Sequence, residues 1–218
     1  MFQTIITFII VFSILVIIHE FGHFYFAKKA GILVREFAIG MGPKIFSHRK
    51  NGTTYTIRML PIGGYVRMAG IGDEDTELKA GMPLNITLDE EQQVIQIDLS
   101  NKQHLQAVPI ELLEADLEHA LFIEGIIPGS SEPVRYAVKR DATIIETDGT
   151  EVQIAPIDVQ YQSAPLLKRM LTNFAGPMNN FILGIAVFIA IAFVQGGVTV
   201  NESRLGEIQP DSPAEAAG

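Results

Sequence analysis

The chain has 218 residues, a formal net charge of −9 and no cysteine, and 48% of its residues are hydrophobic. The lack of cysteine excludes disulfides, a thiolate nucleophile and zinc bound by cysteine, and the acidic charge argues against nucleic acid as a partner. The mean hydropathy is positive, and the apolar residues concentrate in two blocks near residues 2–27 and 171–194, on either side of a polar segment.

The first block predicts a membrane helix over residues 1–27. No charged residue occurs between Phe2 and Ile18, and Lys28-Lys29 end the apolar run. About 26 residues at 1.5 Å each give roughly 39 Å, which is enough to cross a bilayer with some tilt. A cleaved signal peptide is the alternative, but the start carries no basic side chain and a His-Glu pair stands where the cleavage site would lie.

The pattern His-Glu-x-x-His occurs inside this block, at His19, Glu20 and His23. Residues four apart lie on one face of a helix, so both imidazoles can bind one metal ion. Zinc suits two neutral nitrogen ligands, and Glu20 is placed to take a proton from a water that the metal acidifies. A pair of hydrogen-bonded histidines near a helix end is the other interpretation. The cost of ionisable residues inside a membrane span favours the metal site.

The segment 28–70, after the first block, is rich in glycine and β-forming residues and is predicted to be β-rich and associated with the membrane. Thr54–Leu60 is typical of a strand. Pro61 and the pair Gly63-Gly64 are expected to break or bend that strand.

Residues 71–169 are predicted to form a β-rich cytoplasmic insert. Asp148-Gly149 is a hairpin turn signal between two short β patterns, whereas Glu111–Leu121 is expected to form a short helix. No function follows from the sequence for residues 84–160. An acidic loop and three scattered histidines are expected to be solvated: Asp73, Glu74, Asp75, His48, His104 and His119.

The second block predicts another membrane helix over residues 170–195, because its apolar run has no polar face. Two interpretations stay open for a stripe of residues in it: a helix–helix interface with small residues and an asparagine hydrogen bond, or support of the active site. In either case the stripe is expected to point at the first helix. Its members share one helical face and are Asn173, Pro177, Asn180 and Gly184.

The basic residues predict the orientation of both helices. Of the 16 Lys and Arg residues, only Arg204 lies outside residues 28–169. Basic residues near the ends of spans favour the cytoplasm. We therefore expect a multi-pass protein of the cell membrane with its N-terminus outside, residues 28–169 in the cytoplasm and residues 196–218 outside again.

Four motifs follow one another in the order His19–His23, Gly40–Lys44, Pro61–Val66 and Asn173–Phe181. With these motifs the chain resembles the site-2 protease family of intramembrane zinc metalloproteases, in its RseP-type, Gram-positive branch, over nearly its whole length. Residues 196–218 resemble the start of an extracytoplasmic PDZ domain.

The resemblance implies that His19, His23 and an aspartate bind zinc, with Glu20 as the general base. In the family the aspartate belongs to a Leu-Asp-Gly motif on a later membrane helix. No span of this chain carries that motif, so the third zinc ligand is expected beyond Gly218, and the chain is expected to be an N-terminal fragment.

The resemblance also implies that Gly63, Gly64 and Tyr65 lie on a β-hairpin loop that dips into the membrane. A strand edge there could pair with an unwound substrate. Substrate binding is therefore expected at these three residues.

These observations predict an α-helical polytopic membrane protein with a β-rich cytoplasmic insert and the start of a PDZ domain. Its predicted function is that of a zinc metalloendopeptidase in the lipid bilayer, which hydrolyses membrane-spanning substrates in regulated intramembrane proteolysis. The resemblance suggests anti-sigma factors and lipoprotein signal peptides as substrates. The alternatives are a non-catalytic membrane adaptor that binds peptides, an inactive fragment of the protease, and a soluble zinc protease with a buried apolar helix.

Overall fold

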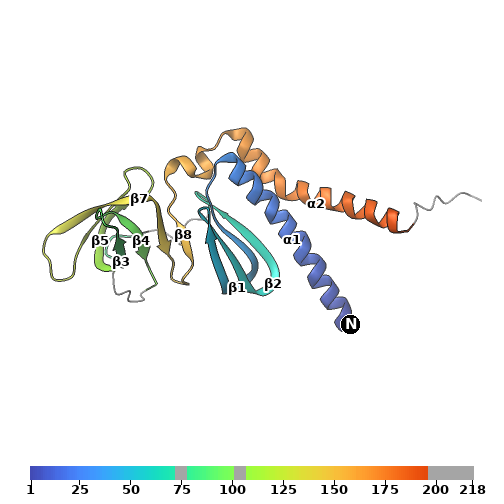
Figure 1. Ribbon diagram of the computed structural model, residues 1–218, viewed down its shortest axis with the longest axis horizontal. Coiled ribbons are helices and arrows are strands. Elements are labelled where there is room, and N and C mark those ends of the chain that lie inside the picture. The colour runs from blue at the N-terminus through green and yellow to red at the C-terminus, as the bar shows by residue number, and fades with distance from the viewer. Residues whose placement is uncertain (72–77, 101–106, 196–218) are drawn as a thin grey trace, which may run out of the picture. The chain divides into compact units, whose positions relative to one another are not determined.

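The computed structural model describes residues 1–71, 78–100 and 107–195, and Figure 1 shows its elements in chain order. The chain divides after Phe181 into two compact units, and the described part of the second unit is the end of the second α-helix. The elements are α1 Phe2–Ala30, β1 Val34–Lys50, β2 Thr53–Met68, β3 Pro83–Leu88, β4 Val94–Asp98, β5 Val108–Asp116, β6 Phe122–Ile126, β7 Pro133–Ile145, β8 Glu151–Gln153, the short 3₁₀ helices Ile157–Val159 and Tyr161–Ser163, and α2 Leu166–Val194.

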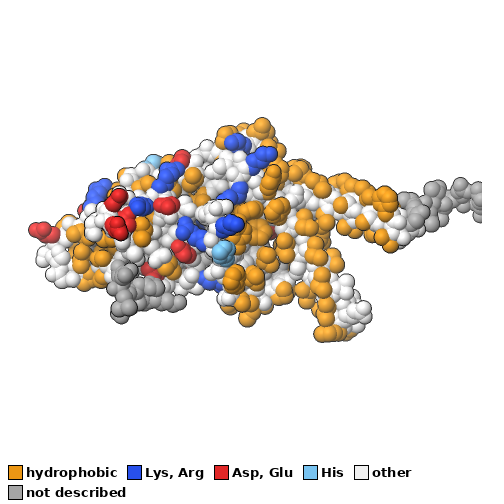
Figure 2. Space-filling model, in the orientation of Figure 1, with side chains coloured by type: hydrophobic (Ala, Val, Ile, Leu, Met, Phe, Trp, Pro, Cys, Tyr) orange, Lys and Arg blue, Asp and Glu red, His pale blue; other side chains and the backbone are white. Residues whose placement is uncertain are grey.

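The helices α1 and α2 are long, apolar and exposed along most of their length. Each has 29 residues, and the mean hydropathy of the most apolar window is 2.4 in α1 and 2.0 in α2. At 1.5 Å per residue each helix extends roughly 44 Å, which exceeds the hydrocarbon core of a bilayer. Figure 2 shows hydrophobic side chains exposed along both helices, and this composition indicates a membrane location.

Strands β1 and β2 are long and bent, so each contributes two segments to one sheet. Residues 34–41 lie between residues 54–60 and 64–68, and residues 44–50 pair with 53–58 on the far side. The bend expected at Gly63-Gly64 is confirmed, because β2 continues through a left-handed Gly63 with φ 82°. As a result, residues 64–68 form one edge of this sheet and residues 44–50 form the other.

Strands β3 to β7 form a closed barrel with its own core. The strands β4, β3, β5, β6 and β7 are neighbours in that order, and the parallel pairing of β4 with β7 closes the ring. β8 pairs with the end of β7. Side chains that alternate along the strands fill the interior, among them Ile86, Ile97, Ile110, Leu112, Ile123 and Ile144.

The predicted fold class, an α-helical polytopic membrane protein, is wrong. The described part of the chain has only two α-helices, and its largest body is the closed five-stranded barrel. The two apolar runs gave a strong signal in the sequence, whereas each barrel strand is short and gives a weak one. The expected start of a PDZ domain, residues 196–218, lies outside the described residues.

The helix predicted at Glu111–Leu121 is also wrong, because β5 covers most of this segment. Burial alternates along β5: Ile110 and Leu112 are buried, whereas Glu111 and Leu113 are exposed. A period of two is that of a strand with one face on a core. The window was too short for the sequence to separate this period from that of a helix.

The hairpin turn predicted at Asp148-Gly149 is confirmed by the antiparallel pairing of β7 with β8. His48 and His119 are exposed, as predicted. The remaining residues expected to be solvated lie outside the described part of the chain: Asp73, Glu74, Asp75 and His104.

Candidate metal centre

The two histidines of the motif turn their ring nitrogens toward each other. His19 and His23 lie one turn apart on α1, and their Nε2 atoms are 3.2 Å apart. Two nitrogens bound to one tetrahedral zinc ion at about 2.05 Å are about 3.3 Å from each other. The rings are therefore already spaced as two ligands of one ion, and Glu20 follows the first of them directly in the helix.

Two glycines allow α2 to approach this pair closely. A β-carbon added at Gly176 would lie 2.3 Å from His23 Nε2 and 2.6 Å from His19 Nε2. One added at Gly22 would lie 2.4 Å from the carbonyl oxygen of Ala175. Both distances are far shorter than a van der Waals contact, so a larger residue at either position would push the helices apart.

The helix α2 also orients both imidazoles through their second ring nitrogens. His23 Nδ1 lies 2.7 Å from the carbonyl oxygen of Thr172, so it must donate a proton there and leaves the Nε2 lone pair for a metal. His19 Nδ1 lies 3.3 Å from Asn180 Nδ2, and within the described residues the buried Asn180 Oδ1 has no hydrogen-bond partner.

Turning the Asn180 amide by 180° exchanges its oxygen and nitrogen. This accounts both for the contact between two nitrogens and for the unpartnered oxygen. The orphaned Oδ1 then accepts the Nδ1–H of His19, and a buried polar atom gains a partner. In this arrangement both histidines donate from Nδ1 and present Nε2 as an acceptor. The pair of rings therefore fits a bound metal ion.

We expect Asn180→Leu to lower the zinc affinity of the full-length protein about 10- to 100-fold, because His19 loses the group that orients it. Asn180→Asp should keep the affinity, since a carboxylate oxygen also accepts the Nδ1–H. Competition with a chromophoric chelator measures the affinity. Asn173→Leu is the matched control, because Asn173 is exposed. Unchanged affinity in Asn180→Leu would rule out the orienting role.

The face of α2 that meets α1 is rotated from the predicted stripe. Of the predicted members, Asn180 reaches His19, whereas Asn173 and Pro177 are exposed. The residues that contact α1 follow one another at spacings of three, four and seven, and they are small or present a polar group. This pattern is visible in the sequence and is typical of packed membrane helices. They are Thr172, Ala175, Gly176 and Asn179.

A third protein ligand does not occur in the part of the chain that the structure describes. No group of three or more His, Asp or Glu residues there could hold a metal ion. Imidazole nitrogens suit zinc, and a catalytic zinc normally has three protein ligands and an open position. Within the described residues, His19 and His23 are the two groups that would hold such an ion.

The edge of the β1–β2 sheet runs beside the same stretch of α1. Ser13 Oγ donates to the carbonyl oxygen of Pro61 at 2.6 Å, and a β-carbon added at Gly64 would lie 3.8 Å from Val16. A backbone hydrogen bond from Val66 reaches the Glu20 carboxylate.

The amide of Val66 therefore points away from β1. Because backbone groups two residues apart in a strand point to the same side, the amide and carbonyl of Gly64 also point to the open edge. Gly63, Gly64 and Tyr65 thus lie on the edge strand that leads to Glu20.

A buried carboxylate joins the strands of this sheet, and no pattern in the sequence marks it. Glu36 is 1% exposed and accepts hydrogen bonds from Thr56 at 2.6 Å, Arg58 at 2.9 Å and Tyr65 at 2.8 Å. Burial and the bond to Glu36 raise the pKa of Tyr65, so its hydroxyl remains a donor. The partners of Glu36 come from both flanking strands, and no local spacing in the sequence brings them together.

The tip of the β7–β8 hairpin is joined to this sheet by polar side chains, and we call this the hairpin contact. Arg67, next to Val66 on the edge strand, pairs with Glu146 at 2.7 Å. Burial raises the pKa of Glu146, and the charge of Arg67 opposes that rise. Further pairs are Arg58–Asp148 at 3.7 Å, Lys44–Thr150 at 3.1 Å, Arg49–Glu151 at 3.5 Å and Arg49–Gln153 at 3.4 Å.

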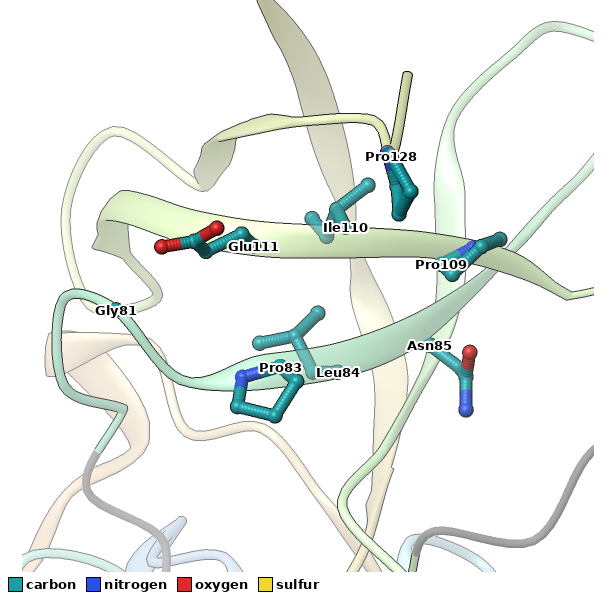
Figure 3. Close-up of a pocket in the computed structure, with 8 residues that line it drawn as sticks. All are labelled: Gly81, Pro83, Leu84, Asn85, Pro109, Ile110, Glu111 and Pro128. Carbon is teal, nitrogen blue, oxygen red and sulfur yellow. The ribbon is translucent and has the colours of Figure 1, made fainter. Parts of the chain in front are cut away.

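A cavity of about 440 Å³ lies in the barrel between β3 and β5, as Figure 3 shows. Three prolines line it, Pro83, Pro109 and Pro128, and Glu111 is the only lining residue that can ionise. A catalytic site needs an acid and base, a nucleophile with its activator, or a set of metal ligands. This cavity has none of them among its lining residues.

A long apolar helix that carries His-Glu-x-x-His, with its two Nε2 atoms facing each other, is typical of membrane metallopeptidases. The chain belongs to peptidase family M50, whose model matches residues 7–215. The predicted family is thereby confirmed.

The relatives that match the chain carry names of the same kind. "Probable protease eep" of Enterococcus faecalis is 62% identical over an alignment of 220 positions, which covers 99% of this chain and 52% of that protein. A protein of Streptococcus pneumoniae named as a candidate zinc metalloprotease is 56% identical over 98% of this chain and 51% of its own length. A Lactococcus lactis protein of similar name is 53% identical over 100% of this chain and 54% of its own length. The chain thus spans about half the length of the curated relatives that it matches.

Proposed function

We propose that this chain forms one half of the active site of a zinc endopeptidase that hydrolyses peptide bonds within the membrane. The observation that carries the proposal is the 3.2 Å separation of the Nε2 atoms of His19 and His23 on an apolar helix. Membership of a peptidase family and the zinc metalloprotease names of the relatives support it. Nothing found favours a non-catalytic adaptor.

In this proposal His19 and His23 hold the zinc ion, with Thr172 and Asn180 orienting their rings. Zinc bound there supplies the Lewis acidity that activates a water and polarises the scissile carbonyl. Glu20 is the general base, and it transfers the proton that it accepts to the leaving amine. The Val66 amide holds the Glu20 carboxylate beside the sheet edge. Glu20 therefore keeps a fixed position relative to a substrate strand that pairs with this edge.

The substrate class is membrane-spanning protein segments, with Gly63, Gly64 and Tyr65 as the binding strand. A transmembrane helix must unwind before a protease can attack its backbone, and an edge strand satisfies the freed groups by pairing with them. The open edge at Gly64 offers such groups two residues from Val66. Anti-sigma factors and lipoprotein signal peptides fit this class, and their cleavage is regulated intramembrane proteolysis.

The zinc requirement is tested with the full-length protein in liposomes that also contain a membrane-spanning peptide substrate. A membrane-permeant zinc chelator should reduce cleavage to background, and added Zn²⁺ should restore it, whereas added Ca²⁺ should not. Calcium prefers six to eight oxygen ligands and does not suit imidazole pairs. Cleavage that continues at full rate in the chelator would overturn the zinc assignment.

We further propose that residues 28–169 face the cytoplasm, because the basic residues concentrate there. The chain has no cysteine, so a single introduced cysteine reports its own location. In a cysteine-free full-length background, a membrane-impermeant maleimide should label Gln3→Cys in intact cells and Glu132→Cys only after lysis. Labelling of Glu132→Cys in intact cells would show the opposite orientation.

We also propose that residues 196–218 begin a PDZ domain.

A further inference from the structure

The end of α1 and the start of α2 line a second, smaller and open cavity that the proposed protease function does not use. Its volume is about 240 Å³, and its lining residues are Phe26, Lys29, Ala30, Lys168 and Leu171. Two lysines and three apolar residues thus share one hollow. Lys29 lies in the last turn of α1, and Lys168 lies in the first turn of α2.

The two lysines of this cavity lack acidic partners in the described part of the chain. The Lys29 ammonium lies 5.9 Å from the centre of the Tyr25 ring, and the Lys168 ammonium lies 3.4 Å from the carbonyl oxygen of Ala30. No carboxylate pairs with either of them within those residues. Their positive charge is therefore available to a ligand.

The neighbouring basic residues, Lys28 and Arg169, differ from these two lysines in position. Lys28 donates to the carbonyl oxygen of Asn51 at 2.9 Å and to Thr53 at 3.2 Å. Arg169 lies over the Tyr161 ring. Neither of these two cations lines the cavity. The cavity thus selects Lys29 and Lys168 from a group of four basic residues at the same depth.

The position of the cavity defines the chemistry of its occupant. It lies where two apolar helices end in basic residues, which is the level of lipid phosphates in a bilayer. Leu171 is 44% exposed, and Met170 beside it is 59% exposed, so apolar surface continues from the cavity along α2. A ligand there needs an anionic head for the two lysines and a hydrocarbon chain for this surface.

We propose that this cavity binds the phosphate of an anionic phospholipid, with Lys29 and Lys168 on the phosphate and an acyl chain along Phe26 and Leu171. The bound lipid bridges the end of α1 to the start of α2. Basic pockets between membrane helices are known to take lipid headgroups of this kind. A chain with a net charge of −9 repels anions in general, so binding depends on these two local cations.

The test is native mass spectrometry of the full-length protein in detergent, with phosphatidylglycerol and phosphatidylcholine of equal chain length. Wild-type protein should retain phosphatidylglycerol in preference to phosphatidylcholine. The double variant Lys29→Gln, Lys168→Gln should weaken the binding of phosphatidylglycerol roughly 30-fold, at about fivefold for each lysine near the surface. The conservative double variant Lys29→Arg, Lys168→Arg should retain it.

The matched control is the double variant Lys28→Gln, Arg169→Gln, which removes the same charge at the same depth outside the cavity and should change the affinity less than about threefold. Glycerol 3-phosphate, which has the head but no acyl chain, should fail to displace the lipid. Equal losses in both glutamine variants, no loss in the cavity variant, or displacement by glycerol 3-phosphate would each overturn the proposal. If the cavity double variant does not fold, the single variant Lys168→Gln replaces it, with an expected loss of about fivefold.

Discussion

Replacing Glu20 by glutamine in the full-length protein is expected to abolish cleavage while leaving the fold and the zinc content intact. Glutamine has nearly the same shape as glutamate and can occupy the same place beside Val66, but it cannot accept a proton from water. The two proposed zinc ligands on this helix, His19 and His23, are unchanged. Loss of a general base costs about 10²- to 10⁴-fold in rate, so cleavage should fall to the limit of detection.

The measurement pairs a cleavage assay in liposomes with metal analysis of the same purified sample. Glu90→Gln is the control, because it makes the same chemical change at an exposed position and should cleave at the wild-type rate. Wild-type cleavage by Glu20→Gln would refute the general-base assignment. Loss of zinc together with activity would instead identify Glu20 as a ligand.

A proline at Gly64 is expected to reduce cleavage about 100-fold or more without removing zinc. Proline lacks the amide hydrogen that Gly64 directs to the open edge, so a substrate strand loses a backbone hydrogen bond there. The site also has little room, since a β-carbon at Gly64 would lie 2.7 Å from the carbonyl oxygen of Ala38. The histidines lie on α1 and do not depend on this amide.

The matched control for Gly64→Pro is Ser47→Pro, on the opposite edge of the same sheet. Lys50 and Thr53 flank a two-residue turn and pair directly, so alternate counting directs the Ser47 amide away from its neighbouring strand. Ser47→Pro should therefore cleave normally and report any general effect of proline on the sheet. Equal cleavage by both variants, for several substrates, would limit Gly64 to a structural role.

The facing arrangement of the two histidines could be predicted from the sequence because its geometry is local. Four residues of helix fix the spacing of His19 and His23, and the apolar run fixes their surroundings. The groups that orient the rings lie about 150 positions later on α2, and the predicted stripe captured Asn180 but not Thr172. The rotation of α2 about its axis depends on how Gly176 packs against the two imidazoles, which is a contact between helices that no single helix encodes.

The sheet and the barrel were harder to predict because their contacts join segments that are far apart in the sequence. Short strands have a weak period, and β5 was interpreted as a helix because Glu111–Leu121 is compatible with either spacing. Closure of the barrel rests on the parallel pairing of β4 with β7, which joins segments distant in sequence. Glu36 illustrates the limit most clearly, since its burial depends on donors from two strands that lie on opposite sides of it.

The hairpin contact holds charged groups where water has little access. The side chains of Arg67 and Glu146 are only 11% and 10% exposed. Removing one partner of a buried ion pair leaves an uncompensated charge and is strongly destabilising. A neutral residue at position 146 of the barrel would therefore disturb Arg67 on the edge strand, so the two bodies depend on each other electrostatically although each has its own strands.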